Sequence, residues 1–321
     1  MNVLRLLNRS ISTTILLNVI FVGLWLMSAF WFAGEKNDVE IAVFNAFTLF
    51  SLPYFWSVIA QLLCFALLSL FVSNIIFSQY FTITTYLPFS VLMLFGTAFQ
   101  SAHLFGNQLF ATLFLVLAIW QFIKIDISRD NSLIVLNTFL LFMASVFFVP
   151  EFIYFTTVFI FVFFCFIEIK FKTLIIMLFS ISMPILCALG VCFLLDRIDL
   201  FVIFFYKLFD FKINTQLFEI NTMIIALISI IFVLISLFLF WKNIRIYKFQ
   251  VRRFTLFLVI FWLSTMFFML LQNNFRYFIL TYIILSSFFI SLNLTNLQPQ
   301  KVRKSKPVKR RLKKYKKITN R

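Results

Sequence analysis

Charged side chains are scarce in this chain. Asp, Glu, Lys and Arg make up 12% of its 321 residues, whereas 63% are apolar and 51 are Phe. An ordinary soluble domain is about one-quarter charged, and its polar surface could not cover this much apolar side chain. The composition therefore excludes a soluble globular domain and indicates a protein embedded in a bilayer.

Motifs for common catalytic and transport mechanisms are also missing. The chain has five Gly, one His and four Cys, without a Gly-rich phosphate loop, a Gly-x-Ser-x-Gly elbow or a metal-ligand spacing, so no metal site is predicted. No long apolar run has an ionisable residue at its centre, as ion-coupled transporters usually do. Pro88 and Pro184 are the only Pro well inside such runs, which does not favour the broken helices of transporters. A flippase whose cavity is lined by polar side chains alone remains an alternative function.

Long apolar runs recur along most of the chain. Each has about twenty residues, enough to cross a hydrocarbon core of roughly 30 Å as a helix. Barrel strands are excluded because the runs are too long and do not alternate. The predicted spans are residues 14–33, 56–77, 80–99, 104–123, 132–150, 152–169, 173–195, 220–241, 254–271 and 275–293. Only residues 100–103 separate the third from the fourth, so eight or nine spans are the alternative to ten.

The positions of Lys and Arg predict the orientation. With ten spans and a cytoplasmic N-terminus, 23 of the 28 Lys and Arg lie on the cytoplasmic side and five outside. This asymmetry follows the positive-inside rule and places both termini in the cytoplasm. The first run is longer than the apolar core of a signal peptide, which favours an uncleaved span. We therefore predict an all-α, polytopic helical membrane domain over residues 1–298 and a basic cytoplasmic tail over residues 299–321.

Acidic residues have the opposite distribution, with eight of the eleven Asp and Glu outside. Two of the outer loops, residues 34–53 and 196–219, mix Phe with charge, and the first has apolar residues at helical spacing from Ile41 onward. Amphipathic segments of this kind lie in the membrane interface. We predict that these two segments cover a cavity that faces the outer leaflet.

The polar residues expected around this cavity form a candidate site. Asp38 is the preferred catalytic base, with Glu35 and Glu40 as the alternatives, because a carboxylate can deprotonate an acceptor hydroxyl. Arg276, before the last span, suits a phosphate because its guanidinium donors form a fork. Glu151, at the end of the fifth span, is a second substrate-binding candidate. Solvated loop charges without a catalytic role are the alternative interpretation of the three loop carboxylates.

His103 lies in the short outer turn between the third and fourth spans. As the only His in the chain, it lacks a companion for metal binding, and a lone His is more often a surface or packing residue. A contribution to substrate binding is the alternative interpretation of this side chain.

The first two spans and the acidic loop between them resemble the type C glycosyltransferases, multi-span enzymes that take a sugar from a polyprenyl-phosphate donor. Those enzymes place an acidic residue in the first outer loop, beside interface-lying helices, and their donor and acceptor meet at the outer face. The resemblance implies a polyprenyl-phosphate-linked sugar as the ligand, Asp38 as the base and Arg276 as the partner of the lipid phosphate. The second acidic motif and the large outer domain usual in active members are missing. Whether the chain is an enzyme is therefore left open, and no cofactor is identified.

A central segment carries a second resemblance. The run LFATLFLVLAIWQFIKIDISRDNSLIVLNTFLLFMASVFFVPEFIYF, Leu109–Phe155, together with the Arg-bearing start and the Phe- and Leu-dominated spans, is similar to an uncharacterised family of bacterial multi-pass inner-membrane proteins. This resemblance implies a location in the bacterial inner membrane and no particular activity. The alternative function is therefore a non-catalytic subunit or scaffold of an envelope export or assembly complex, with a protein partner.

The tail is strongly basic. Residues 301–321 contain twelve Lys and Arg and no acid, most densely at Lys309, Arg310, Arg311, Lys313 and Lys314. At about 1 kcal/mol per basic residue near an anionic leaflet, the tail is expected to adhere to anionic lipid. Docking to ribosomal RNA or to an acidic partner is the alternative. Tyr315 is its only aromatic residue, so specific nucleic-acid recognition is not indicated.

Overall fold

The structure is a computed structural model, and it describes residues 19–27, 54–73, 87–98, 106–124, 131–166, 171–209, 220–242, 244, 249–271 and 276–296. Its helices are α3 (Tyr54–Val72), α5 (Leu87–Ala98), α6 (Asn107–Ile123), α7 (Ser132–Phe148), η3 (Pro150–Tyr154), α8 (Phe155–Phe166), α9 (Phe171–Leu194), α10 (Ile198–Phe209), α11 (Ile220–Lys242), α12 (Phe249–Leu271) and α13 (Arg276–Asn296). Residues 19–27 are also helical, and the described ranges contain no strand. The predicted all-α class is confirmed for this part of the chain.

Three of the described helices are long and apolar enough to cross a membrane. They comprise Phe171–Leu194, Ile224–Lys242 and Val251–Met269. The other apolar helices are shorter, and α5, with 12 residues, is about 18 Å long, which is less than a hydrocarbon core. The structure therefore supports a membrane protein, while the total of ten spans and the location of the termini stay predictions.

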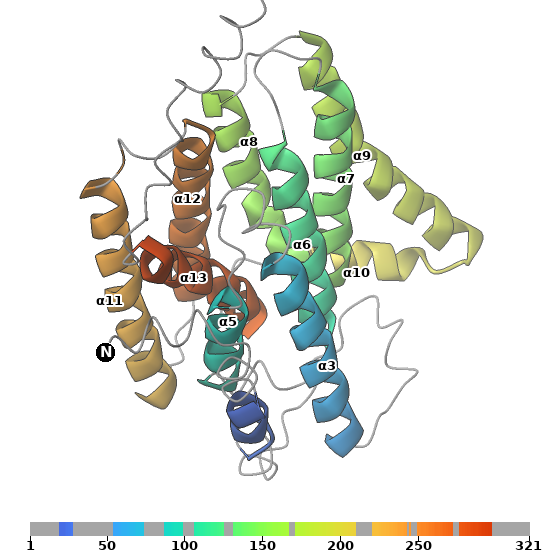
Figure 1. The fold of residues 1–321 in the computed structure, drawn as a ribbon. Helices are drawn as coiled ribbons and strands as arrows, with labels where there is room; N and C mark the ends of the chain where they lie inside the picture. The colour runs from blue at the N-terminus through green and yellow to red at the C-terminus, as the bar shows by residue number, and fades with distance from the viewer. Residues whose placement is uncertain are drawn as a thin grey trace, which may run out of the picture.

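Helices α6, α7, α8 and α12 form an antiparallel bundle (Figure 1). Ring contacts join the start of one helix to the end of another: Phe110 to Phe148 at 5.6 Å, Phe268 to Phe155 at 5.3 Å, and Phe257 to Phe122 at 4.8 Å. The bundle therefore has two distinct ends. We call them the η3 end, where α7 ends and α8 begins, and the Lys124 end, where α6 ends and α12 begins.

Phenylalanine dominates the interior of this bundle. Phe159 of α8 is fully buried, and the centroid of its ring lies 4.7 Å from that of Phe261 and 4.9 Å from that of Phe142. Further rings from α6, α7 and α12 complete its surroundings: Phe122, Phe139 and Phe257. Such offset and edge-to-face contacts are the arrangements that aromatic pairs prefer. The ring of Phe159 therefore joins four helices.

Helix α13 lies in the core and contacts α5, α6, α11 and α12. The side chains from Phe278 to Phe289 are all buried, as expected of a helix that is apolar on every face. Two polar contacts tie it to its neighbours. The hydroxyl of Tyr282 hydrogen-bonds that of Ser229 in α11, and the indole N–H of Trp262 in α12 donates to Ser286 Oγ at 3.0 Å.

Helices α9 and α11 expose much of their apolar surface. Phe171 and Leu194 of α9 are 79% and 82% exposed, and Phe238 of α11 is 70% exposed. An apolar surface of this extent is not stable in water. These faces therefore suit contact with lipid or with another membrane helix.

The turn after α9 directs the chain into α10. Asp196 has a φ of 51°, in the left-handed region that Asp tolerates better than most residues. The N–H of Arg197 donates to Cys192 O at 2.9 Å and that of Asp196 to Phe193 O at 3.2 Å, which is the Schellman pattern of a helix end. The strongly amphipathic α10 follows, within the loop predicted to lie in the interface.

Candidate functional site

Most of the sequence-predicted site lies outside the described residues. This applies to the three loop carboxylates, to the histidine and to the basic tail: Glu35, Asp38, Glu40, His103, Lys309, Arg310, Arg311, Lys313 and Lys314. The described part of the candidate site consists of Glu151 and of the helix start at Arg276.

Glu151 lies in the first turn of η3. Pro150 precedes it at a helix-initiating position, where the missing N–H of Pro costs nothing. The side chain of Glu151 is half-buried, and its Oε2 is shielded from solvent. The positive end of the helix dipole favours a carboxylate at this position. The local sequence therefore places a negative charge at the rim of an apolar bundle.

The start of α13 lies beside η3. The ring centroid of Phe278, two residues after Arg276, is 5.5 Å from that of Phe152 and 5.8 Å from that of Phe155. Phe268, near the end of α12, is 6.0 Å from Phe278. We call these four rings, Phe152, Phe155, Phe268 and Phe278, the phenylalanine floor. The structure thus brings the helix starts that carry Glu151 and Arg276 to the same end of the bundle, around this floor.

This arrangement combines groups of complementary chemistry. Three rings of the phenylalanine floor, Phe152, Phe155 and Phe278, are completely buried. The floor therefore fixes the two helix starts relative to each other. A carboxylate and a guanidinium belong to these starts, and a guanidinium suits an anionic group such as a phosphate. Glu151 and Arg276 were predicted to lie on the outer face, and the side of the membrane that this end of the bundle meets stays a prediction.

The Lys124 end is basic. The helix ends that meet there carry Lys124, Lys172, Lys242, Arg252 and Arg253. The ammonium of Lys124 lies 3.2 Å from the centroid of the Trp120 ring, a cation–π contact. Desolvation by neighbouring side chains lowers the pKa of the Lys124 side chain, although the residue is exposed. The described charged residues at this end are all basic, whereas the η3 end carries both Glu151 and Arg276.

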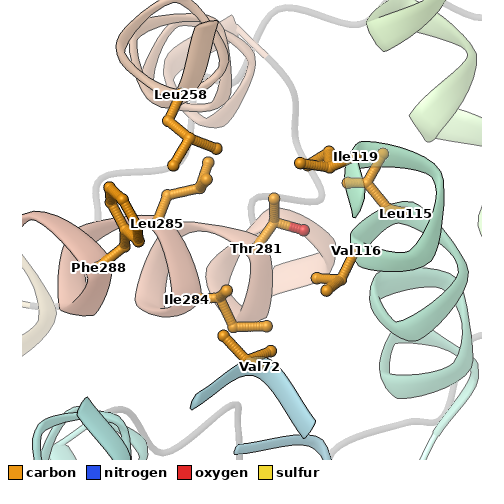
Figure 2. A pocket seen from close by; sticks show the side chains of 9 residues that line it. All are labelled: Val72, Leu115, Val116, Ile119, Leu258, Thr281, Ile284, Leu285 and Phe288. Carbon is orange, nitrogen blue, oxygen red and sulfur yellow. The ribbon is translucent and has the colours of Figure 1, made fainter. Parts of the chain in front are cut away.

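A small cavity lies between α3, α6, α12 and α13 (Figure 2). It measures about 20 Å³ and is lined by Val72, Leu115, Val116, Ile119, Leu258, Thr281, Ile284, Leu285 and Phe288. Figure 2 shows the hydroxyl of Thr281 pointing toward α6, and its Oγ1 has no hydrogen-bond partner in the described part of the chain. This volume suits about one water molecule. It cannot hold a sugar or a lipid headgroup.

The sequence interpretation missed the polar contacts of α13. Tyr282 and Ser286 lie in a run that was treated as a plain span, yet each bonds to a different neighbouring helix. The available signal was the presence of hydroxyl side chains four residues apart within an apolar helix, since such groups often join helices in membranes. Over the described ranges, no group of three His, Cys, Asp or Glu side chains could hold a metal ion.

The helices define an all-α protein with three segments that could cross a membrane. The chain matches no known protein-family model, no curated protein and no solved structure.

Proposed function

We propose that the chain is a multi-pass protein of the bacterial inner membrane that acts on a lipid-linked glycan at the outer face, in the manner of a type C glycosyltransferase. One observation carries the proposal: η3, with Glu151, and the start of α13, with Arg276, meet at the phenylalanine floor. The floor holds these two helix starts together, and Arg276 would bind the lipid phosphate at this end of the bundle.

The proposed reaction is a sugar transfer to an acceptor hydroxyl. Asp38 removes the hydroxyl proton while the hydroxyl oxygen attacks the anomeric carbon. The bond between that carbon and the lipid phosphate breaks, and the phosphate leaves with the bonding electrons. Arg276 stabilises the negative charge that develops on the phosphate oxygen, and Glu151 orients the acceptor. Glu35 and Glu40 are the alternative bases.

The distribution of charge supports the proposed orientation. The described Lys and Arg at the Lys124 end belong to the predicted cytoplasmic loops, whereas Glu151 lies at the opposite end. With the Lys124 end in the cytoplasm, the phenylalanine floor faces the outer leaflet. We propose on the same basis that both termini are cytoplasmic, with ten spans, and that the tail adheres to anionic lipid.

The enzymatic proposal predicts separate losses of activity. Asp38→Asn is expected to lower glycan transfer by 10²- to 10⁴-fold, the usual contribution of a general base, and Arg276→Gln to weaken use of the polyprenyl-phosphate donor. Transfer from a radiolabelled polyprenyl-phosphate sugar in isolated membranes measures both effects. Asp199→Asn is the matched control, because Asp199 is an exposed carboxylate in α10. Full activity of Asp38→Asn, Glu40→Gln and Arg276→Gln, with normal membrane insertion, would contradict the proposal.

A second candidate is a non-catalytic subunit or scaffold of an envelope export or assembly complex. The exposed apolar faces of α9 and α11 favour it, since they offer area for another membrane protein. Purification in mild detergent is then expected to retain one partner in stoichiometric amount, and replacing exposed Leu186 and Phe193 of α9 by Ala is expected to release it. A monomer that binds polyprenyl phosphate would contradict this candidate.

A further inference from the structure

At the end of α6, Lys124 lies next to the indole ring of Trp120 and to an apolar side of the helix. Trp120 and Lys124 are one turn apart on α6, and the ammonium lies over the indole ring. This contact holds a positive charge near the end of an apolar helix, where an indole is stable at the boundary between water and hydrocarbon. Lys124 itself is exposed. Its charge is therefore positioned by the ring and still accessible to an anion.

Helix α3 supplies an apolar surface next to the same indole. The ring of Phe71 meets that of Trp120 edge-on at a centroid distance of 6.3 Å. Toward the middle of α3, Leu63, Leu67 and Leu70 are 59%, 66% and 40% exposed. Their spacing of four and three residues puts them on one side of the helix. An apolar strip therefore leads along α3 to the lysine and the indole.

We propose that the ends of α3 and α6 form a binding site for an anionic phospholipid. The phosphate binds the ammonium of Lys124, which the Trp120 ring holds in place. One acyl chain lies along the leucine strip of α3. Basic sites between membrane helices bind anionic headgroups in this way. The positioned ammonium and the leucine strip match the anionic headgroup and the acyl chain of a phospholipid, whereas a soluble anion would leave the leucine strip without a ligand.

Titration of the purified full-length protein in mild detergent tests the site. The thermal unfolding temperature is followed while phosphatidylglycerol, phosphatidylcholine with the same acyl chains, or glycerol phosphate is added. Phosphatidylglycerol is expected to raise the unfolding temperature at concentrations at which the other two have little effect. Lys124→Gln is expected to raise the concentration needed for half of this shift about fivefold, equivalent to about 1 kcal/mol for one basic residue at an anionic surface. Trp120→Leu, which removes the ring that holds the ammonium, is expected to raise it about threefold.

Lys242→Gln is the matched control, because Lys242 is an exposed lysine at the end of α11 and the basic tail is unchanged in every variant. Less than a twofold effect is expected. An effect equal to that of Lys124→Gln would overturn the proposal in favour of diffuse charge. Equal shifts with phosphatidylcholine would exclude recognition of the headgroup charge, and equal shifts with glycerol phosphate would exclude a lipid site.

Discussion

Replacing Phe159 by Ala is expected to lower the free energy of unfolding by about 3–5 kcal/mol, the range for a large aromatic side chain in a packed core. The ring is fully buried and contacts five other phenylalanine rings in three neighbouring helices: Phe122, Phe139, Phe142, Phe257 and Phe261. Its removal leaves a cavity that α6, α7, α8 and α12 would have to move together to fill. Interiors of this density do not relax fully, so most of the cost should remain.

The matched control is Phe161→Ala, two residues further along α8. Phe161 is 55% exposed, so lipid or detergent can occupy the space that its ring leaves. The control is expected to cost less than about 1 kcal/mol, in the range of substitutions away from the core. Unfolding of both variants in mixed micelles, followed by near-ultraviolet circular dichroism, measures the difference. Equal losses in the two variants would contradict the central position of the Phe159 ring.

Gly96→Ala is expected to destabilise the protein by about 1–3 kcal/mol through overpacking. A Cβ atom at this position in α5 would lie 2.6 Å from atoms of both the Phe65 ring and the Trp25 ring. These two rings are fully buried and pack against each other with centroids 5.2 Å apart. Neither ring can move away without disturbing the other, so the added methyl group must displace the helix.

Gly190→Ala makes the same substitution in α9, where a Cβ would meet no atom within 4 Å. Ala is about 1 kcal/mol more favourable than Gly inside a helix, so this variant is expected to be as stable as the parent chain or slightly more stable. Thermal unfolding in detergent compares the two variants directly. A stability gain in Gly96→Ala similar to that in Gly190→Ala would show that α5 does not approach Trp25 and Phe65 closely.

The positions of the helices were largely predictable from the sequence. The runs predicted at 173–195 and 220–241 match α9 and α11 within two residues at each end. The match arises because charged and polar clusters end the apolar runs and backbone groups in lipid must bond within a helix. Of the run predicted at 80–99, the structure describes Leu87–Ala98, which is helical as α5.

The contacts between helices were not predictable. Phe occurs on every side of most runs, so the pattern does not identify the side that faces the core. Phe159 and Phe161, both in α8, look equivalent in the sequence, yet one is buried and the other exposed. The structure brings Glu151 and the start of α13 to one end of the bundle, whereas Asp38 lies outside the described residues, so the composition of the candidate site stays a prediction. The resemblance to type C glycosyltransferases implies chemical roles for the site residues, and the contacts between helices do not test these roles.

The two hydrogen bonds of α13 fix the position of this helix along its own axis. Tyr282 and Ser286 are one turn apart and bond to α11 and α12 respectively. Phe, Leu and Ile contacts alone would change little if α13 slid by one turn, about 5.4 Å, because similar side chains would replace one another. After such a slide, the Tyr282 hydroxyl and the Trp262 N–H would both lose their partners in an apolar interior, at a cost of about 1–3 kcal/mol each. Two hydroxyl-bearing residues therefore select one alignment of the central helix from several that are almost equally well packed.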